Sequence, residues 1–129
     1  MNYQEKLQKC YESFRKKTDF VPEVAIILGS GLGALADEID TVAAVDYSEI
    51  EGFPTSTVPG HKGRFVLGYM NDVSVVIMQG RVHYYEGYPM QDVVLPTRLM
   101  KLMGAKVLFL TNASGGVNRD FSAGDFMLI

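Results

Sequence analysis

Hydrophobic and polar positions change their spacing several times along the chain, and each change predicts a new element. Residues 3–17 place apolar side chains at helical spacing with charged residues between them, which predicts an amphipathic helix. Pro22 interrupts this pattern before residues 24–28, a short apolar run typical of a buried strand. Residues 34–38, after a glycine-rich turn, are predicted to form the next helix, and residues 41–47 a second strand.

The middle of the chain alternates between turn formers and β-rich runs. A loop is expected over residues 53–63, and the runs 64–70 and 73–78 meet at Asn71-Asp72, which predicts a β-hairpin. A polar and aromatic loop follows over residues 80–89. Helical spacing returns over residues 93–103, and Gly104 is well placed to end that helix.

Two apolar runs complete the pattern. Residues 106–111 are predicted to be a further buried strand, and residues 125–129 a strand that ends without a turn, a cap or a polar tail. A chain can end in a docked strand, but such an ending is also expected from a cut through a domain. Alternating strands and helices indicate an α/β fold with a mixed β-sheet flanked by helices. We therefore expect residues 1–129 to be a truncated chain.

Composition narrows the classes of function. The 129 residues are 47% hydrophobic and 21% charged, which is typical of a globular domain. A formal net charge of −3 without a basic patch disfavours a nucleic-acid surface. Cys10 is the single cysteine, so a reducing compartment, the cytoplasm, is expected. No apolar run approaches the roughly 20 residues of a membrane span.

A glycine turn between the first strand and the next helix is the first candidate for chemistry. Gly29-Ser30-Gly31-Leu32-Gly33 lets backbone N–H groups approach an anion, to which the N-terminus of the following helix adds partial positive charge and Ser30 a hydroxyl donor. The turn also fits the loose dinucleotide pattern, with Asp46 or Glu49 as the ribose-binding acid. A tight structural turn without a ligand is the third interpretation.

The loop after residue 79 carries a denser group of polar side chains. In extended backbone Arg81, His83 and Tyr85 share one side, so a cation, a titratable donor and a phenol face one space. Arginine binds phosphate through two parallel hydrogen bonds, and histidine donates to the same anion. Glu86 is expected to hold the histidine ring in one tautomer. An exposed loop with a surface ion pair is the alternative.

Two further segments become candidates for the same site when they are considered together with the glycine turn and the loop after residue 79. Residues 111–116 follow a strand and should lie at its carboxyl edge beside the glycine turn, where Ala113 and Ser114 offer backbone amides. His61 lies in the loop 57–63 and matters only if it joins the other groups. A metal site has little support, because the two histidines lack companion cysteines or clustered carboxylates at ligand spacing.

Several strings, in order and at matching separations, resemble the trimeric purine nucleoside phosphorylase family. The resemblance runs from about Pro22 to the last residue. Its matching segments are residues 29–33, 46–50, 53–54, 56–61, 80–81, 83, 85–89, 111–118 and 124–129.

The resemblance implies roles for individual residues. Phosphate binding falls to Ser30, Arg81, His83 and the backbone of Ala113. His61 and Tyr85 would border the ribose, and the catalytic residues would be His83, Glu86 and His61. The residues beside the purine are Ala113, Ser114 and Gly115.

The implied reaction is phosphorolysis of inosine- or guanosine-type nucleosides to a free purine and ribose 1-phosphate. This is a transferase reaction of purine salvage, with phosphate as co-substrate and no cofactor or metal. Family members are homotrimers and continue for a second half that recognises the base, which implies that residues 1–129 are the N-terminal portion of a single nucleoside phosphorylase domain without its C-terminal half. Two alternatives stay open: a catalytically incomplete fragment that keeps half of the site, and a dinucleotide-binding domain.

Overall fold

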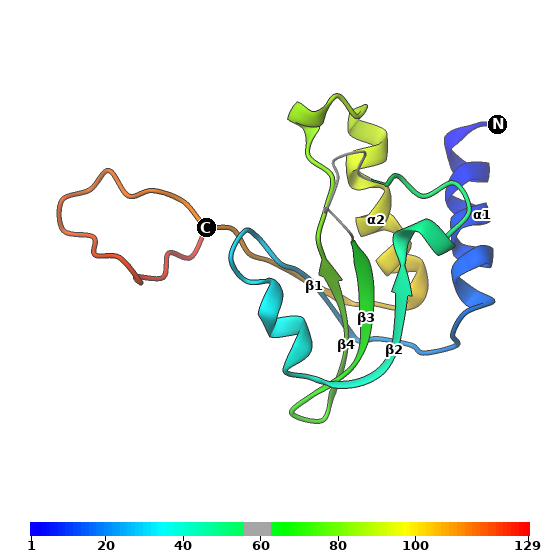
Figure 1. Cartoon of the computed structure of the whole chain (residues 1–129), viewed down its shortest axis with the longest axis horizontal. Coiled ribbons are helices and arrows are strands. Elements are labelled where there is room, and N and C mark those ends of the chain that lie inside the picture. The colour runs from blue at the N-terminus through cyan, green and yellow to red at the C-terminus, as the bar shows by residue number, and fades with distance from the viewer. Residues whose placement is uncertain (56–62) are drawn as a thin grey trace.

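Five strands form one mixed sheet in the order β2-β3-β4-β1-β5 in this computed structural model, which describes residues 1–55 and 63–129 (Figure 1). The strands are β1 (Val24–Ile27), β2 (Asp40–Asp46), β3 (Arg64–Met70), β4 (Val73–Gln79) and β5 (Val107–Leu110). β1 lies between β4 and β5 and is parallel to both, whereas β2, β3 and β4 are antiparallel neighbours. The predicted α/β fold with a mixed sheet is confirmed.

Two helices pack together on one face of the sheet (Figure 1). α1 (Tyr3–Arg15) begins with a capping box, in which the Asn2 side chain accepts from the Glu5 N–H at 2.9 Å and Glu5 accepts from the Asn2 N–H at 3.0 Å. α2 (Met90–Met103) ends at Gly104, whose φ of 122° is a conformation that favours glycine. Both helices were predicted, and Gly104 is the predicted stop.

The main core lies between these helices and the sheet. Phe65 of β3 has no exposed surface and lies at its centre. Its ring centroid is 6.0 Å from that of Phe14, 5.1 Å from that of Tyr47 and 5.5 Å from that of Phe53, each in an edge-to-face arrangement. The ring therefore joins α1, the strand and the segment after β2.

A smaller apolar cluster covers part of the other face. Ala36 and Ile39 pack there on β1, β3 and β4. Ala36 belongs to η1 (Gly33–Asp37), a five-residue 3₁₀ helix. The predicted helix over residues 34–38 is therefore only a short turn of 3₁₀ type, so it does not supply the helix-terminal charge that the sequence analysis ascribed to it.

The hairpin between β3 and β4 forms as predicted. Asn71 and Asp72 both adopt positive φ, 47° and 66°, which matches the twist required of a two-residue hairpin turn. This turn lies at the opposite end of β4 from the residues that carry the candidate chemistry.

The last part of the chain departs from two predictions. Residues 106–111 do form a strand, β5, but its four residues are between 42% and 64% exposed instead of buried. β5 is an edge strand, and the residues that follow it extend away from the sheet (Figure 1). Residues 125–129 form no strand and are exposed, because they pair with no neighbour in the described chain.

The two edge strands of the sheet, β2 and β5, differ in how well they are protected against pairing with another chain. β2 carries Asp40 and Asp46 at its ends and an irregularity between Thr41 and Ala43, features that discourage pairing with another chain. β5 consists only of apolar residues, and its outer edge is open. We expect Phe109→Lys to raise the concentration at which the chain self-associates by about tenfold, as measured by light scattering. Val42→Lys on β2 is the control, and an equal effect of both variants would contradict a role for β5.

Within the described ranges, no helix is long and apolar enough to cross a membrane.

Candidate functional site

Three parallel strands end at the same edge of the sheet, and each is followed by a segment that carries predicted site residues. Ile27 of β1 pairs with Met78 of β4 and with Leu110 of β5, so the three carboxyl ends are level. The glycine turn, the loop that begins at Gly80 and the segment that begins at Thr111 therefore leave the sheet together. Ligands of open α/β sheets bind outside such strand ends.

The Thr111 hydroxyl ties two of these segments together. It accepts from the Gly29 N–H at 3.0 Å and donates to the Ile27 carbonyl at 2.9 Å. A Cβ added at Gly29 would lie 2.7 Å from the Asn112 Cα, so the two backbones are in direct contact. The prediction that residues 111–116 lie beside the glycine turn is confirmed for Thr111 and Asn112, the first two residues of the segment.

Gly29→Ala should separate these backbones. The new methyl group would meet main-chain atoms that cannot rotate away, and we expect a loss of about 1–3 kcal/mol in the free energy of unfolding. The matched control is Gly33→Ala, because none of the described residues has an atom within 4 Å of a Cβ at Gly33. Denaturant unfolding of both variants checks this prediction. Equal stability of the two would contradict the close contact.

The turn itself exposes Ser30 at the surface. Gly31 adopts a φ of 83°, which side chains rarely tolerate, and the Leu32 N–H bonds back to the Gly29 carbonyl at 3.2 Å. The turn therefore places Ser30 and its backbone directly beyond the end of β1. Its suitability for an anion rests on these donors and not on a helix dipole.

Tyr47 holds the start of the second loop. Its hydroxyl donates to the Gly80 carbonyl at 2.6 Å, directly before the half-buried Arg81, and Gly80 has a φ of 93°. Burial raises the pKa of Tyr47, so this phenol remains a proton donor throughout the physiological range. Sequence reasoning missed Tyr47, because its partner lies 33 residues away and no local pattern marks it.

His83 and Tyr85 lie together further along this loop. Their ring centroids are 4.8 Å apart with 18° between the ring planes, a stacked pair. The backbone is not extended throughout, because Tyr84–Glu86 form a 3₁₀ turn, η3. The predicted alternation of side chains therefore ends at His83, and stacking brings Tyr85 beside it instead.

Glu86 makes a different contact from the one expected. Its carboxylate accepts from the backbone N–H of His83 at 2.8 Å, while the buried Nδ1 of His83 has no hydrogen-bond partner among the described residues. Glu86 thus fixes the backbone at His83 and not the tautomer of its ring. Tyr88 then ties the loop back, since its hydroxyl donates to the Thr55 carbonyl.

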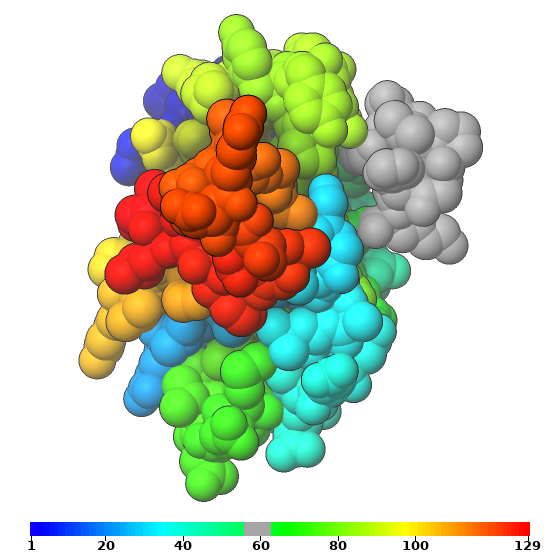
Figure 2. Space-filling view, turned by 90° about the vertical axis from the view of Figure 1, so that its left-hand side faces the viewer, coloured from blue at the N-terminus to red at the C-terminus, as the bar shows by residue number. Residues whose placement is uncertain are grey.

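The remaining predicted site residues are Ala113, Ser114, Gly115 and His61. Ala113, Ser114 and Gly115 are exposed beyond β5, and the Ser114 hydroxyl donates to the Asn112 side chain at 2.9 Å. The end of the chain, orange to red in the space-filling view, stands in front of the rest of the molecule, and Asn112 near its start contacts Gly29 (Figure 2). His61 lies outside the described residues.

The topology rejects the dinucleotide-binding alternative. That fold requires an acid at the end of a parallel strand beside the first one. Asp46 instead ends β2, an antiparallel strand that β3 and β4 separate from β1. Nor do residues 1–55 and 63–129 gather three or more side chains that could hold a metal ion.

Comparison with known proteins identifies relatives that are similar to this chain in sequence and in fold. Purine nucleoside phosphorylase 1 of Bacillus subtilis is 55% identical over 108 residues, which is 84% of this chain and 40% of that protein. A solved purine nucleoside phosphorylase in complex with ribose 1-phosphate superposes with a TM-score of 0.87 at 46% identity. The Schistosoma mansoni enzyme in complex with inosine gives 0.86 at 44% identity.

These likenesses cover most of this chain but less than half of each relative. The two structures match over 94% of this chain, and the chain covers 44% and 42% of theirs. The chain thus spans less than half the length of the relatives it resembles. Residues 23–129, which include all three strand-end segments, match the Phosphorylase superfamily as a family. From this match and the shared fold, the chain belongs to the Phosphorylase superfamily.

Proposed function

We propose that the chain carries the phosphate-binding part, and some of the ribose-binding part, of a purine nucleoside phosphorylase. The observation that carries this proposal is the convergence of three segments at one sheet edge. Each brings the kind of donor that an anion requires: the hydroxyl of Ser30, the guanidinium of Arg81 and the backbone amides after Thr111. Relatives of this name at 44–55% identity support the same activity.

Ser30, Arg81, His83 and the Ala113 backbone are assigned to phosphate. The Nδ1 of His83 is buried and without a partner in the described chain, so this ring keeps an unused hydrogen-bonding group beside the strand ends. Tyr85, stacked on His83, is assigned to the ribose together with His61. Ala113, Ser114 and Gly115 are assigned to the edge of the purine, and Glu86 supports His83 through its backbone.

The proposed reaction is a displacement at the anomeric carbon of the nucleoside. The bond from this carbon to the purine nitrogen breaks, and the base leaves with the electron pair and takes up a proton, which balances the proton that hydrogen phosphate loses as it becomes the ester. A phosphate oxygen forms the new bond on the opposite face, which gives ribose 1-phosphate. The sugar becomes cationic as the bond breaks, and phosphate held by Arg81 and His83 stabilises this charge and is already oriented for attack.

Assembly and compartment belong to the same proposal. A homotrimer follows from the family resemblance, and the cytoplasm follows from the lone Cys10, which is buried and free. Sedimentation of the chain would show whether a trimer forms. No metal or organic cofactor is part of the proposal, and inorganic phosphate is the co-substrate.

Release of hypoxanthine from inosine, followed by ultraviolet absorbance with and without phosphate, tests the activity. Phosphate-dependent release by the 129-residue chain would support phosphorolysis directly. A second candidate is a chain that binds phosphate without turnover, and its basis is that the chain covers only 40% of its Bacillus relative. Phosphate binding without release would favour this candidate, and absence of both would contradict the proposed function.

A further inference from the structure

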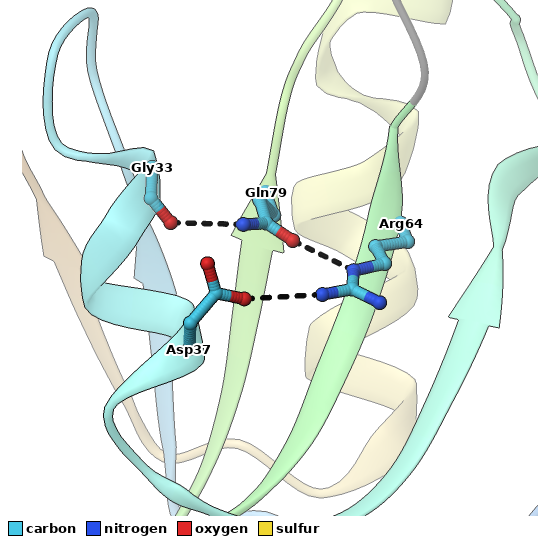
Figure 3. A network of polar contacts seen from close by, with 4 residues as sticks. All are labelled: Gly33, Asp37, Arg64 and Gln79. Atoms are coloured by element: carbon cyan, nitrogen blue, oxygen red, sulfur yellow. Dashed lines mark hydrogen bonds and ion pairs between the residues drawn. The ribbon is translucent and has the colours of Figure 1, made fainter.

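The last side chain of β4 turns toward the glycine turn and joins it to the rest of the sheet. Gln79 directly precedes Gly80 and Arg81, and both ends of its amide are bonded (Figure 3). Its Nε2 donates to the Gly33 carbonyl at 2.9 Å, and its Oε1 accepts from the Arg64 Nε at 2.7 Å. The Gln79 side chain at the end of β4 thus links the first residue of η1 to the first residue of β3.

These partners allow only one orientation of the amide. A carbonyl oxygen is solely an acceptor and a guanidinium is solely a donor, so the Gln79 nitrogen must face Gly33 and its oxygen must face Arg64. The half-buried side chain is therefore fixed in both position and rotation. A reversed amide would lose both bonds.

The outer arm of the network is weaker. The Arg64 Nη2 lies 3.2 Å from the Asp37 Oδ1, so Arg64 also forms an ion pair with the last residue of η1. The side chains of Arg64 and Asp37 are 41% and 62% exposed, respectively. Exposed ion pairs of this kind contribute little to stability. The connection between the glycine turn and the strand end thus depends mainly on Gln79.

The backbone alone does not maintain this connection as far as the site. Among the described residues, the last backbone bond between the two segments runs from the Leu28 N–H to the Met78 carbonyl at 3.4 Å. Beyond it no backbone hydrogen bond joins the turn with Ser30 to the loop with Arg81 in the part of the chain that the structure describes. The Gln79 side chain spans this gap, one residue before the Tyr47 hydroxyl binds Gly80.

We propose that Gln79 is a positioning residue, which sets the spacing between Ser30 and Arg81 so that both reach one phosphate. This rests on the proposed phosphate site. Gln79 itself faces Gly33 and Arg64 and is not assigned to the ligand. Its loss should therefore weaken phosphate binding while the chain stays folded.

The first test measures phosphate affinity by calorimetry. Gln79→Met keeps the length of the side chain and removes both hydrogen bonds, and it should raise the Kd for inorganic phosphate about tenfold. Gln91→Met makes the same change at an exposed position on α2 and should leave the Kd within twofold. Circular dichroism establishes that both variants fold. A Kd for Gln79→Met within twofold of the unsubstituted chain would overturn the proposal.

The second test requires no phosphate. The N–H groups of Leu32 and Leu35 bond within the turn and η1, so their hydrogen exchange reports how firmly this segment is held. Exchange should be about fivefold faster in both Gln79→Met and Gln79→Glu, because each lacks the donor to Gly33. Asp37→Asn, at the exposed arm, should change exchange less than twofold. Unchanged exchange in the Gln79 variants would also overturn the proposal.

The two tests separate this proposal from the proposed function. If the unsubstituted chain fails to bind phosphate, the phosphate site is contradicted, while the exchange rates still decide whether Gln79 holds the turn. If the chain binds phosphate and the Gln79 variants bind it equally well, the site stands and the positioning role falls.

Discussion

Arg81→Ala is expected to weaken binding of inorganic phosphate by about 10- to 100-fold. Arginine supplies a permanent charge and two parallel hydrogen bonds, and hydrogen bonds to charged groups contribute about 1.5–3 kcal/mol each. Arg81 is half-buried and follows Gly80, whose carbonyl the Tyr47 hydroxyl holds at 2.6 Å. A ligand at the strand ends would therefore meet a guanidinium on a fixed backbone. Isothermal titration with phosphate measures the loss.

Arg98→Ala is the matched control for this variant. It removes the same charge from α2, where the Arg98 guanidinium lies 5.0 Å from the centroid of the Tyr3 ring. Any effect of net charge alone is common to both variants. We expect phosphate affinity to remain within twofold for Arg98→Ala. Near-normal affinity of Arg81→Ala, or equal losses in the two variants, would remove Arg81 from the site.

Phe65→Ala is expected to cost about 3–5 kcal/mol of unfolding free energy. Phe65 has no exposed surface, and its ring contacts those of Phe14, Tyr47 and Phe53. Its truncation leaves a cavity where α1, β3 and the segment after β2 meet. Because domains are stable by only about 5–15 kcal/mol, this variant should unfold at much lower urea concentration.

Phe126→Ala provides the same chemical change without burial, since Phe126 is fully exposed. Its midpoint of urea unfolding should match that of the unsubstituted chain. The comparison separates the packing contribution from any general effect of losing a phenyl ring. A Phe65→Ala midpoint equal to that of Phe126→Ala would contradict the position of the main core.

Most elements follow from local patterns in the sequence. The spacing of apolar residues located α1 and α2, and Asn71-Asp72 marked the hairpin, because positive φ at both positions is a local property of that turn. The relation between the glycine turn and residues 111–116 was also predictable. It needs only that parallel strands end at a common edge, and the contact between Gly29 and Asn112 confirms it.

Other features depend on tertiary context that a local pattern does not contain. Residues 106–111 are as apolar as a buried strand, yet β5 lies at an edge where little of the described chain covers it. The segment after Gly33 has helical composition but forms only the 3₁₀ turn η1, which packs through Ala36 and is bonded by Gln79. Such contacts link residues 46 positions apart, as between Gln79 and Gly33.

Titration of the ¹⁵N-labelled chain with inorganic phosphate tests the central claim most directly. If the three strand-end segments form one anion site, saturable shifts should appear at the backbone amides of Ser30, Arg81, His83 and Ala113. The amides of Asn71 and Asp72, at the opposite end of β4, should not respond, and chloride at equal ionic strength should have no effect. Absent shifts, or shifts spread evenly over the chain, would contradict a phosphate site at this edge.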